Sequence, residues 1–484
     1  MNRKVAGLLL LSMLTCRALL AETAAPSEPP MPCQLPSSEP LSFEQALQEM
    51  LTRHETLQGA AVDVARAGAE KQAARTLKLP RIDLEARQTF LDESITIGVE
   101  PLPVRFTVQD EQFTEGQVTL SWPVYTGGRV RAANRAADEK VVEFEAELKR
   151  TRHSLITELA RRYFGLRLAD SAARVARLKA EDLAGHERRA KRLMEEGLIA
   201  RVEWLSARVA STQADAEAES LLADTRVARE ALLNMLGREG GDIFPSTPFS
   251  IPLSLPDQKV FLEKINSDHP VIALIAAKQR QARAGVEAER GQRRPTIYLF
   301  GMHELVPEDL TLLDPRWAAG IGIRQNLFDG GQSRHRETAA KYLEEKAALT
   351  RRRLERDLKT LAIKNWEEIQ KAQHDWRAMT ELEELAQENL RVRTRAFEEG
   401  VATSLEVVDA AVALQRARLG RVKAAHDAEM GLFRLLEAAG MSDQCLEFLN
   451  SGQQVDLDLP QPIMEPMVPD AAENETRTKE VTAP

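Results

Sequence analysis

One long proline-free segment occurs twice in this chain, and that repeat restricts the possible folds more than any other feature. Residues 128–237 and 331–440 contain no proline. Their glycines match at a constant offset, since Gly128, Gly197 and Gly237 recur 203 residues later as Gly331, Gly400 and Gly440. The copies therefore differ by no net insertion, and insertions are tolerated in loops but resisted in packed elements. The repeat predicts two versions of one long helical hairpin.

Each hairpin is predicted to contain one unusually long helix. A helix from Arg129 to Glu196 would be about 100 Å long at a rise of 1.5 Å per residue. Apolar residues recur along it at steps of three, four and seven, a narrow seam typical of coiled-coil packing: Val141, Phe144, Leu148, Leu155 and Leu159. Gly197 and Gly400 each follow a Glu-Glu pair where this period breaks. Glycine ends helices readily, so we expect both to form hairpin tips.

The composition agrees with a coiled coil and argues against other classes. Of 484 residues, 29% are charged and only 5% are aromatic, a balance more typical of coiled coils than of globular domains. The net charge of −9 disfavours nucleic acid as a partner. The His-Glu pairs at His54, His186 and His303 lack the second histidine that zinc ligation on a helix requires. We therefore predict no enzyme activity, no cofactor and no metal site.

The amino terminus predicts export from the cytoplasm. Arg3 and Lys4 precede an apolar run, residues 5–14, that is too short to span a membrane. Residues 1–21 are therefore predicted to be a removable signal peptide. Residues 22–40 are rich in Pro, Ser and Glu and are predicted to form an extended segment.

Two pairs of strands complete the repeats. Residues 82–123 and 296–327 each contain two runs in which apolar and polar residues alternate, which is typical of strands with one apolar face. Before the strands the offset between the copies is 215, as between Pro80 and Pro295, and after them it is 203. The first copy therefore has twelve extra residues, which we expect in a loop near residues 92–113. A half-buried soluble sheet would show the same alternation. The narrow helical seams offer no apolar mass to cover the sheet, however, so strands that span a membrane are favoured.

The expected fold is mainly α, with a small transmembrane β part that copies of the chain must share. Four strands cannot close a barrel, and open edges are not tolerated in lipid. Three chains would supply twelve strands, an even number within the range of outer-membrane barrels. Short helices over residues 55–79 and 198–237, stacked end to end, nearly match the long helix in length. The tandem hairpins would then form the wall of a tunnel below the barrel.

These patterns divide the chain into consecutive regions. The first repeat is predicted over residues 41–243 and the second over residues 258–449, with a proline-rich linker at residues 244–257 between them. The tail, residues 450–484, is rich in Pro, Glu and Asp and lacks periodicity, so it is predicted to be disordered.

Four short runs add a resemblance to a known family. They are Pro-Val-Tyr-Thr-Gly-Gly-Arg at 123–129, Asn-Leu-Phe-Asp-Gly-Gly-Gln at 326–332, Glu-Glu-Gly-Leu-Ile-Ala at 195–200 and Glu-Glu-Gly-Val-Ala-Thr at 398–403. In order and duplicated, they resemble the TolC-like outer-membrane efflux protein family over about residues 41–449. The resemblance implies a homotrimer with a twelve-stranded barrel among outer-membrane lipids, above a periplasmic α-helical tunnel.

The same resemblance implies a function. Such a protein is a passive exit duct of a tripartite efflux or type I secretion system, gated at its periplasmic tip. It docks through a periplasmic adaptor protein to an inner-membrane pump of the RND, ABC or MFS type. The chain would lie in the cell outer membrane, with most of its length in the periplasm. The alternative is a soluble periplasmic coiled-coil adaptor or scaffold, although adaptors usually carry one hairpin without amphipathic strands.

The sequence suggests two sites near the hairpin tips. Glu203, Glu406 and Asp409 follow the tip glycines, and threefold symmetry would gather them into acidic rings at a constriction, which favours cations. An ordinary solvated helix face would have the same spacing. In similar proteins, an aromatic hydroxyl and an arginine help to hold the tip closed, but the matching positions here are Phe397 and Ala402.

The second site is the apolar turn of each hairpin, which offers a contact surface on an otherwise charged helix pair. We expect it to dock the adaptor, although it could be only a turn. The residues are Gly197, Leu198, Ile199, Ala200, Gly400, Val401, Ala402 and Thr403.

The cysteines suggest one covalent link. The residues before Cys16 match a lipoprotein signal poorly, so lipidation is not favoured. Cys33 lies shortly before Leu41, where the first repeat begins, and Cys445 lies shortly after Gly440, where the second ends. Both flank elements that should meet midway along the tunnel. In an exported protein we therefore predict a Cys33–Cys445 disulfide, the alternative being two unpaired thiols.

Overall fold

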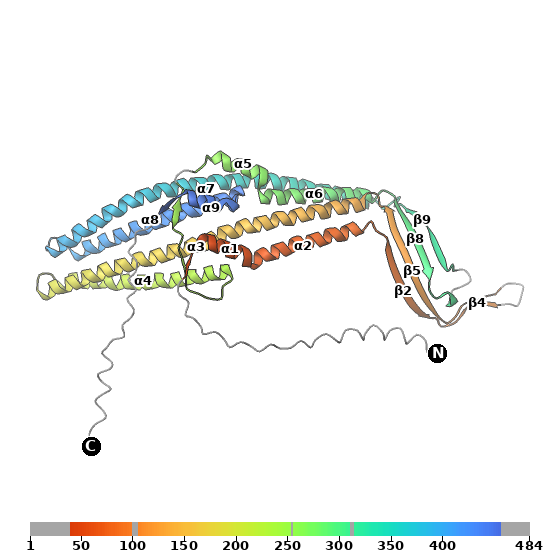
Figure 1. The fold of residues 1–484 in the computed structure, drawn as a ribbon, viewed down its shortest axis with the longest axis horizontal. Helices are drawn as coiled ribbons and strands as arrows, with labels where there is room; N and C mark the ends of the chain where they lie inside the picture. The colour runs from red at the N-terminus through yellow and green to blue at the C-terminus, as the bar shows by residue number, and fades with distance from the viewer. Residues whose placement is uncertain (1–38, 99–104, 253–254, 310–313, 456–484) are drawn as a thin grey trace, which may run out of the picture.

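The computed structural model describes residues 39–98, 105–252, 255–309 and 314–455. Long helices run side by side along one axis, and a four-stranded sheet extends from one end of them (Figure 1). The predicted signal peptide lies outside the described residues. In the described part of the chain, no helix is both long enough and apolar enough to cross a membrane.

The helices of the two repeats correspond one to one. The first repeat contains α1 (Phe43–Arg53), α2 (Glu55–Thr76), α3 (Arg129–Glu195) and α4 (Arg201–Leu236); the second contains α5 (Gln258–Asp268), α6 (Pro270–Gly291), α7 (Gln332–Glu398) and α8 (Ser404–Ala439). Both ends of α1 and α2 recur 215 residues later, and both ends of α3 and α4 recur 203 residues later. The two offsets read from the sequence therefore hold for every one of these helices.

The long helices organise the packing. α3 and α7 each have 67 residues, which corresponds to about 100 Å. α4 returns beside α3, and α2 continues along α3 towards the sheet; α8 and α6 do the same along α7 (Figure 1). α6 and α8 also pack against α3. The short helices of the second repeat therefore lie between two long helices, whereas α2 packs extensively only against α3.

The predicted strands form one antiparallel sheet. Its order is β2 (Arg81–Phe90), β5 (Gln112–Tyr125), β8 (Thr296–Glu304) and β9 (Trp317–Arg324). Cross-strand pairing places the apolar members of each alternation on one face: Ile82, Leu84, Val118, Leu120, Trp122, Ile297, Leu299, Ile321 and Ile323. Many of these are exposed in the single chain, with Ile82 and Ile321 at 70% and 71% of their accessible area.

The extra residues of the first repeat lie where they were expected. Between β2 and β5 the chain forms a separate pair of strands, β3 (Ile95–Gly98) and β4 (Arg105–Gln109), beyond the end of the main sheet (Figure 1). The corresponding part of the second repeat begins with a short 3₁₀ helix, Pro307–Asp309. The length difference is thus absorbed outside the paired core of the sheet, as the loop hypothesis required.

The structure corrects the predicted linker and tail. Within and beside residues 244–257, β6 (Ile243–Pro245) pairs in parallel with β1 (Glu39–Leu41), and β7 (Phe249–Ile251) pairs with β10 (Gln453–Val455). α9 (Cys445–Ser451) and β10 extend ordered structure past the predicted boundary at residue 450. These elements cover an aromatic core midway along the hairpins, built from Phe43, Tyr163, Phe164, Phe249 and Phe433.

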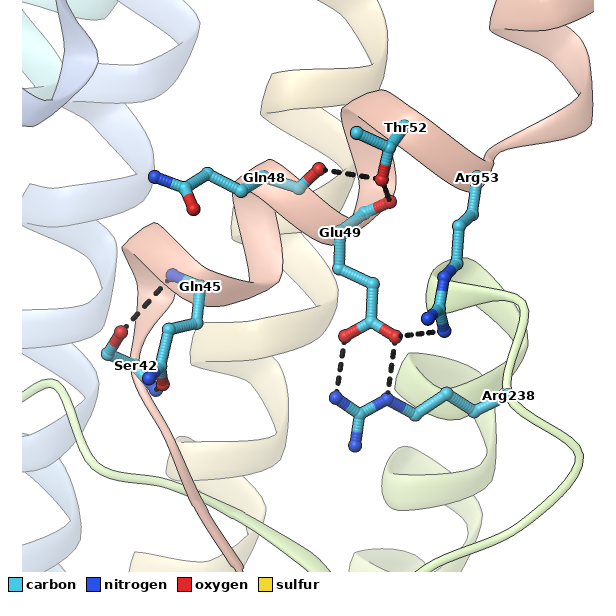
Figure 2. Close-up of polar contacts among 7 residues, drawn as sticks. All are labelled: Ser42, Gln45, Gln48, Glu49, Thr52, Arg53 and Arg238. Atoms are coloured by element: carbon cyan, nitrogen blue, oxygen red, sulfur yellow. Dashed lines mark hydrogen bonds and ion pairs between the residues drawn. The ribbon is translucent and has the colours of Figure 1, made fainter.

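A polar contact fixes α1 at this midpoint. Ser42 and Gln45 form a capping box that begins α1. The Glu49 carboxylate on α1 accepts two hydrogen bonds from the Arg238 guanidinium, at 2.8 and 2.6 Å, just beyond the end of α4 (Figure 2). Arg53 binds the same carboxylate at 2.8 Å. Hydrogen bonding to Arg238 lowers the pKa of Glu49, so the carboxylate stays charged and α1 stays joined to α4.

Candidate functional site

The two hairpin turns lie at the end of the molecule opposite the sheet (Figure 1). Gly197 and Gly400 have φ of +73° and +75°, a conformation that glycine adopts without steric cost. The N–H of Leu198 donates to the Leu193 carbonyl, and the N–H of Val401 donates to the Ala396 carbonyl, at 2.8 and 2.9 Å. These are Schellman bonds, which close a helix end and reverse the chain. Both glycines therefore form the hairpin tips, as predicted.

The predicted docking residues form an exposed apolar tip. Leu198 and Val401 are 68% and 78% exposed. Ile199 and Ala402 are half-buried because they pack against a small apolar cluster formed by Ala190, Ala207, Phe397 and Val407. Gly197, Ala200, Gly400 and Thr403 are exposed. The turn thus presents apolar groups to solvent on a rigid helical support.

The three predicted acids have different surroundings. Glu203 is half-buried, and its Oε2 accepts a hydrogen bond of 2.8 Å from the backbone N–H of Ser404. Glu406 forms an ion pair with Arg393 of α7. Asp409 is exposed, and its carboxylate has no hydrogen bond or ion pair with any described residue. Of these three acids in the described chain, only Glu406 has an ion-pair partner, and only Asp409 has neither an ion pair nor a hydrogen bond.

A buried polar contact that the sequence reasoning missed lies beside these acids. His186 of α3 is 1% exposed, and its Nε2 lies 2.8 Å from Oγ of Ser404, the fully buried first residue of α8. Phe397 of α7 packs edge-to-face with the imidazole at a centroid distance of 4.6 Å. We call His186, Ser404, Glu203 and Phe397 the tip cluster. Its four members come from four helices, α3, α8, α4 and α7, so it joins one hairpin to the other.

The electrostatics of the tip cluster favour neutral imidazole. Burial lowers the pKa of His186 to about 4, and the positive charge of Arg189 acts in the same direction. Arg189 itself binds Glu398 of α7 at 3.5 Å. Nδ1 of His186 is buried and has no partner among the described residues. A proton added to this ring would therefore place a charge in a largely apolar site.

One signal for His186 was available in the sequence. Leu183, His186 and Ala190 follow the apolar seam at steps of three and four, so the histidine occupies a position that faces another helix. Phe397 of α7 is 1% exposed and packs against this histidine.

The remaining predicted site residues are the cysteines. Cys445 is buried in the midpoint core and has no disulfide partner among the described residues, and burial raises the pKa of its thiol to about 11. Cys33 lies outside the described residues, so their disulfide stays a prediction. Within the part of the chain that the structure describes, no cluster of three or more His, Cys, Asp or Glu side chains could hold a metal ion.

Comparisons with known proteins agree with this architecture. The family model for outer membrane efflux proteins matches residues 46–238 and 262–441. The chain is 25% identical to Protein CyaE of Bordetella pertussis over 325 residues, which is 64% of this chain and 65% of CyaE, just under two thirds of its length. It is 24% identical to the cobalt-zinc-cadmium resistance protein CzcC of Cupriavidus metallidurans over 310 residues, 62% of this chain and 71% of CzcC.

A solved structure shows the same fold. The outer membrane protein VceC of Vibrio cholerae matches with a TM-score of 0.70 at 17% identity, over 82% of this chain and 96% of VceC. The family match covers both hairpins, α2, α6 and all four strands of the sheet in full, and most of α1 and α5. The chain therefore belongs to the outer membrane efflux protein family.

Proposed function

We propose that this chain is one protomer of a homotrimeric, passive exit duct in the outer membrane. The duct serves a tripartite efflux or type I secretion system, with a periplasmic adaptor and an inner-membrane pump of the RND, ABC or MFS type as partners. One observation carries the proposal: the sheet exposes a broad apolar face and has two unpaired edges, β2 and β9, among the described strands. Such a sheet is stable in lipid only when copies of it close on one another.

The helices support the same assembly. α6 packs against both α3 and α7, but its counterpart α2 packs extensively only against α3. The missing neighbour of α2 corresponds to α7, which carries exposed apolar residues in the matching stretch: Tyr342, Leu343 and Leu349. A second copy of the chain would supply this α7. Three copies close twelve strands, within the range of outer-membrane barrels.

The internal repeat gives the register of that contact between chains. Within one chain, Lys278 of α6 binds Glu143 of α3 at 3.3 Å. The two offsets map these positions onto Asp63 of α2 and Lys346 of α7, where the charges are exchanged but still complementary. The side chain of Lys346 is exposed, and its ammonium group forms no hydrogen bond or ion pair with a described residue of its own chain. The proposal therefore places Asp63 of one chain beside Lys346 of the next.

Cross-linking tests the assembly and its register. A variant with Asp63→Cys and Lys346→Cys should form covalent trimers in outer membranes when treated with a short bismaleimide. In the matched control, Lys346 is restored and Lys364 is replaced by Cys, which is exposed on the same helix but about 27 Å further along it. The control should form few trimers. A stable monomer in detergent, or recovery of the chain in the soluble periplasmic fraction, would reject the duct in favour of an adaptor or scaffold.

The proposal assigns cation selectivity to the acids near the tip and adaptor binding to the apolar turns. Asp409 is the unpaired carboxylate, so Asp409→Asn should reduce the cation selectivity of single channels more than Glu406→Gln, whose carboxylate is already paired with Arg393. The exposed apolar turn around Leu198 and Val401 is the proposed adaptor contact. Leu198→Asp with Val401→Asp should abolish adaptor binding without reducing the trimer yield.

A further inference from the structure

An apolar cluster and a few polar contacts hold the two hairpins of one chain together at the tip. The cluster contains Ala190, Ala207, Phe397 and Val407, and larger side chains such as Trp204 and Leu390 pack against it. The apolar contribution scales with the buried area and does not depend on pH. The polar contacts of the tip cluster are therefore the part of the attachment that a change of protonation can alter.

The polar contacts are arranged around one residue. Ser404 begins α8 and is fully buried. Its hydroxyl contacts His186 of α3 at 2.8 Å, and its backbone N–H donates to Glu203 of α4 at 2.8 Å. Both contacts come from the first hairpin, and Glu203 lies where an acid is favourable, at a helix amino terminus. Separation of the hairpins would break both contacts at once.

We propose that the tip cluster holds the two hairpins of each chain together at the tip and that protonation of His186 releases them. The geometry gives the reason. The imidazole lies between Ser404 and the ring of Phe397, with Nδ1 buried and without a partner among described residues. An imidazolium ion needs two acceptors and a polar surrounding, which it finds in water after the hairpins separate. Release of the hairpins does not depend on the proposed function, but its effect on channel conductance rests on that function.

The charged groups around His186 oppose its protonation or are already engaged. On α3, Arg189 is positive and lowers the pKa of His186. On α7, Glu398 is bound to Arg189. On α4, Glu203 accepts the N–H of Ser404, and on α8, Glu406 is paired with Arg393. No carboxylate among these is hydrogen-bonded to the imidazole, so none compensates an added proton.

The direction of the pH effect follows from linkage. The pKa of His186 is about 4 in the closed tip, below its ordinary value of 6.5. A base whose pKa is lowered in one state stabilises that state above the ordinary pKa and loses the effect as the pH falls towards the lowered one. The closed tip is therefore favoured fully above pH 6.5, and by pH 5 the closed-to-open ratio falls by roughly 30-fold per chain.

Spin-label distances test the release without relying on conduction. Labels at Leu198→Cys and Val401→Cys, in the full-length chain with its native cysteines replaced, report the separation of the exposed turns of the two hairpins. The distance should lengthen between pH 7.5 and pH 5. His186→Gln keeps a hydrogen-bonding group near Ser404 but does not titrate, so its distance should stay short at both values. Single-channel conductance should rise at pH 5 in the parent and not in His186→Gln.

A second buried histidine supplies the matched control. Burial also lowers the pKa of His269 to about 4, but His269 caps α6 by accepting the N–H of Val271, at the other end of α8. His269→Asn retains a capping side chain and should open at acid pH like the parent. The proposal is overturned if His186→Gln opens over the same range as the parent, or if the parent distance is unchanged at pH 5. If the spin-label distance lengthens at pH 5 but the single-channel conductance does not rise, the release of the hairpins by His186 is supported and the proposed duct is contradicted.

Discussion

The hydroxyl of Tyr163 should contribute measurably to the free energy that attaches two distant segments, at Leu41 and Thr247, to α3. Tyr163 is fully buried in α3. Its hydroxyl donates to the carbonyl of Leu41 at 2.6 Å and accepts the backbone N–H of Thr247 at 3.0 Å. Leu41 begins the first repeat, and Thr247 lies between the repeats. One phenol therefore holds two distant segments on the long helix.

The structure allows the cost of Tyr163→Phe to be estimated. The ring contacts are retained, because Phe43 and Phe164 lie 5.4 and 5.0 Å from the ring centroid. The Leu41 carbonyl also accepts the N–H of Ser246, so it keeps a partner. The N–H of half-buried Thr247 loses this acceptor, and a donor left unsatisfied away from water costs about 1–3 kcal/mol. At about 1.4 kcal/mol per tenfold, local opening should become roughly 5- to 150-fold more frequent.

Hydrogen exchange measures this effect locally and does not require global unfolding to be two-state. A peptide covering residues 244–252 should lose protection in Tyr163→Phe, while peptides at the hairpin tips should not change. Tyr342→Phe is the matched control, because Tyr342 is 67% exposed. If residues 244–252 exchange at the same rate in both variants, the reasoning about the phenol is refuted.

Three further outcomes are expected. Glu429 is fully buried, and burial raises the pKa of its carboxyl well above the ordinary value. The neutral carboxyl therefore contributes stability at low pH that is lost as the pH rises through the raised pKa. Glu429→Gln, which stays neutral, should raise the thermal midpoint at pH 8 but not at pH 4. A Cβ added at Gly322 would lie 2.4 Å from the Tyr298 ring, whereas a Cβ added at Gly301 would have its nearest neighbouring atom 3.6 Å away. Gly322→Ala should therefore reduce the amount of heat-resistant oligomer on gels, and Gly301→Ala should not. Thiol counting on the denatured, unreduced mature chain should find no free thiol if Cys33 and Cys445 are bonded, and two would contradict that bond.

The long elements could be predicted because several independent signals coincide in them. In each hairpin the apolar seam, the absence of proline and the tip glycine indicate the same structure. The duplicated offsets then fix the boundaries of one repeat from those of the other. The strands of the sheet could be predicted for a similar reason, since their alternation extends over eight or more residues and leaves one face apolar.

The midpoint strands could not be predicted from the sequence. β1, β6, β7 and β10 have three residues each, too few for a period to be recognised. Their partners are about 200 residues away along the chain, as between Leu41 and Pro245. The boundary at residue 450 was wrong for the same reason, because β10 is ordered by pairing with β7 rather than by a pattern of its own.

The tip cluster shows what a single sequence can and cannot reveal about a site. The position of His186 on the seam indicates that it is buried, and Glu203 near a helix start indicates a cap. Glu203 lies on α4, but its carboxylate accepts the N–H of Ser404 at the start of α8. The sequence does not indicate this contact, because the two residues are 201 positions apart. Such pairings follow only from the way the two hairpins pack.

The place where the two offsets change has a physical reason. α2 and α6 must each bring the chain to the sheet at the same height beside a long helix, so an insertion within them would shift every contact with α3 or α7. Gly127 shows how tight this junction is, since a Cβ there would lie 2.5 Å from the Gly291 carbonyl at the end of α6. Beyond the paired strands no such constraint acts, and β3 and β4 extend there without altering the register of β2 with β5. The twelve extra residues of the first repeat therefore lie at the far end of the sheet, whereas residues 127–237 and 330–440, which hold the tight junctions and the hairpins, have the same length.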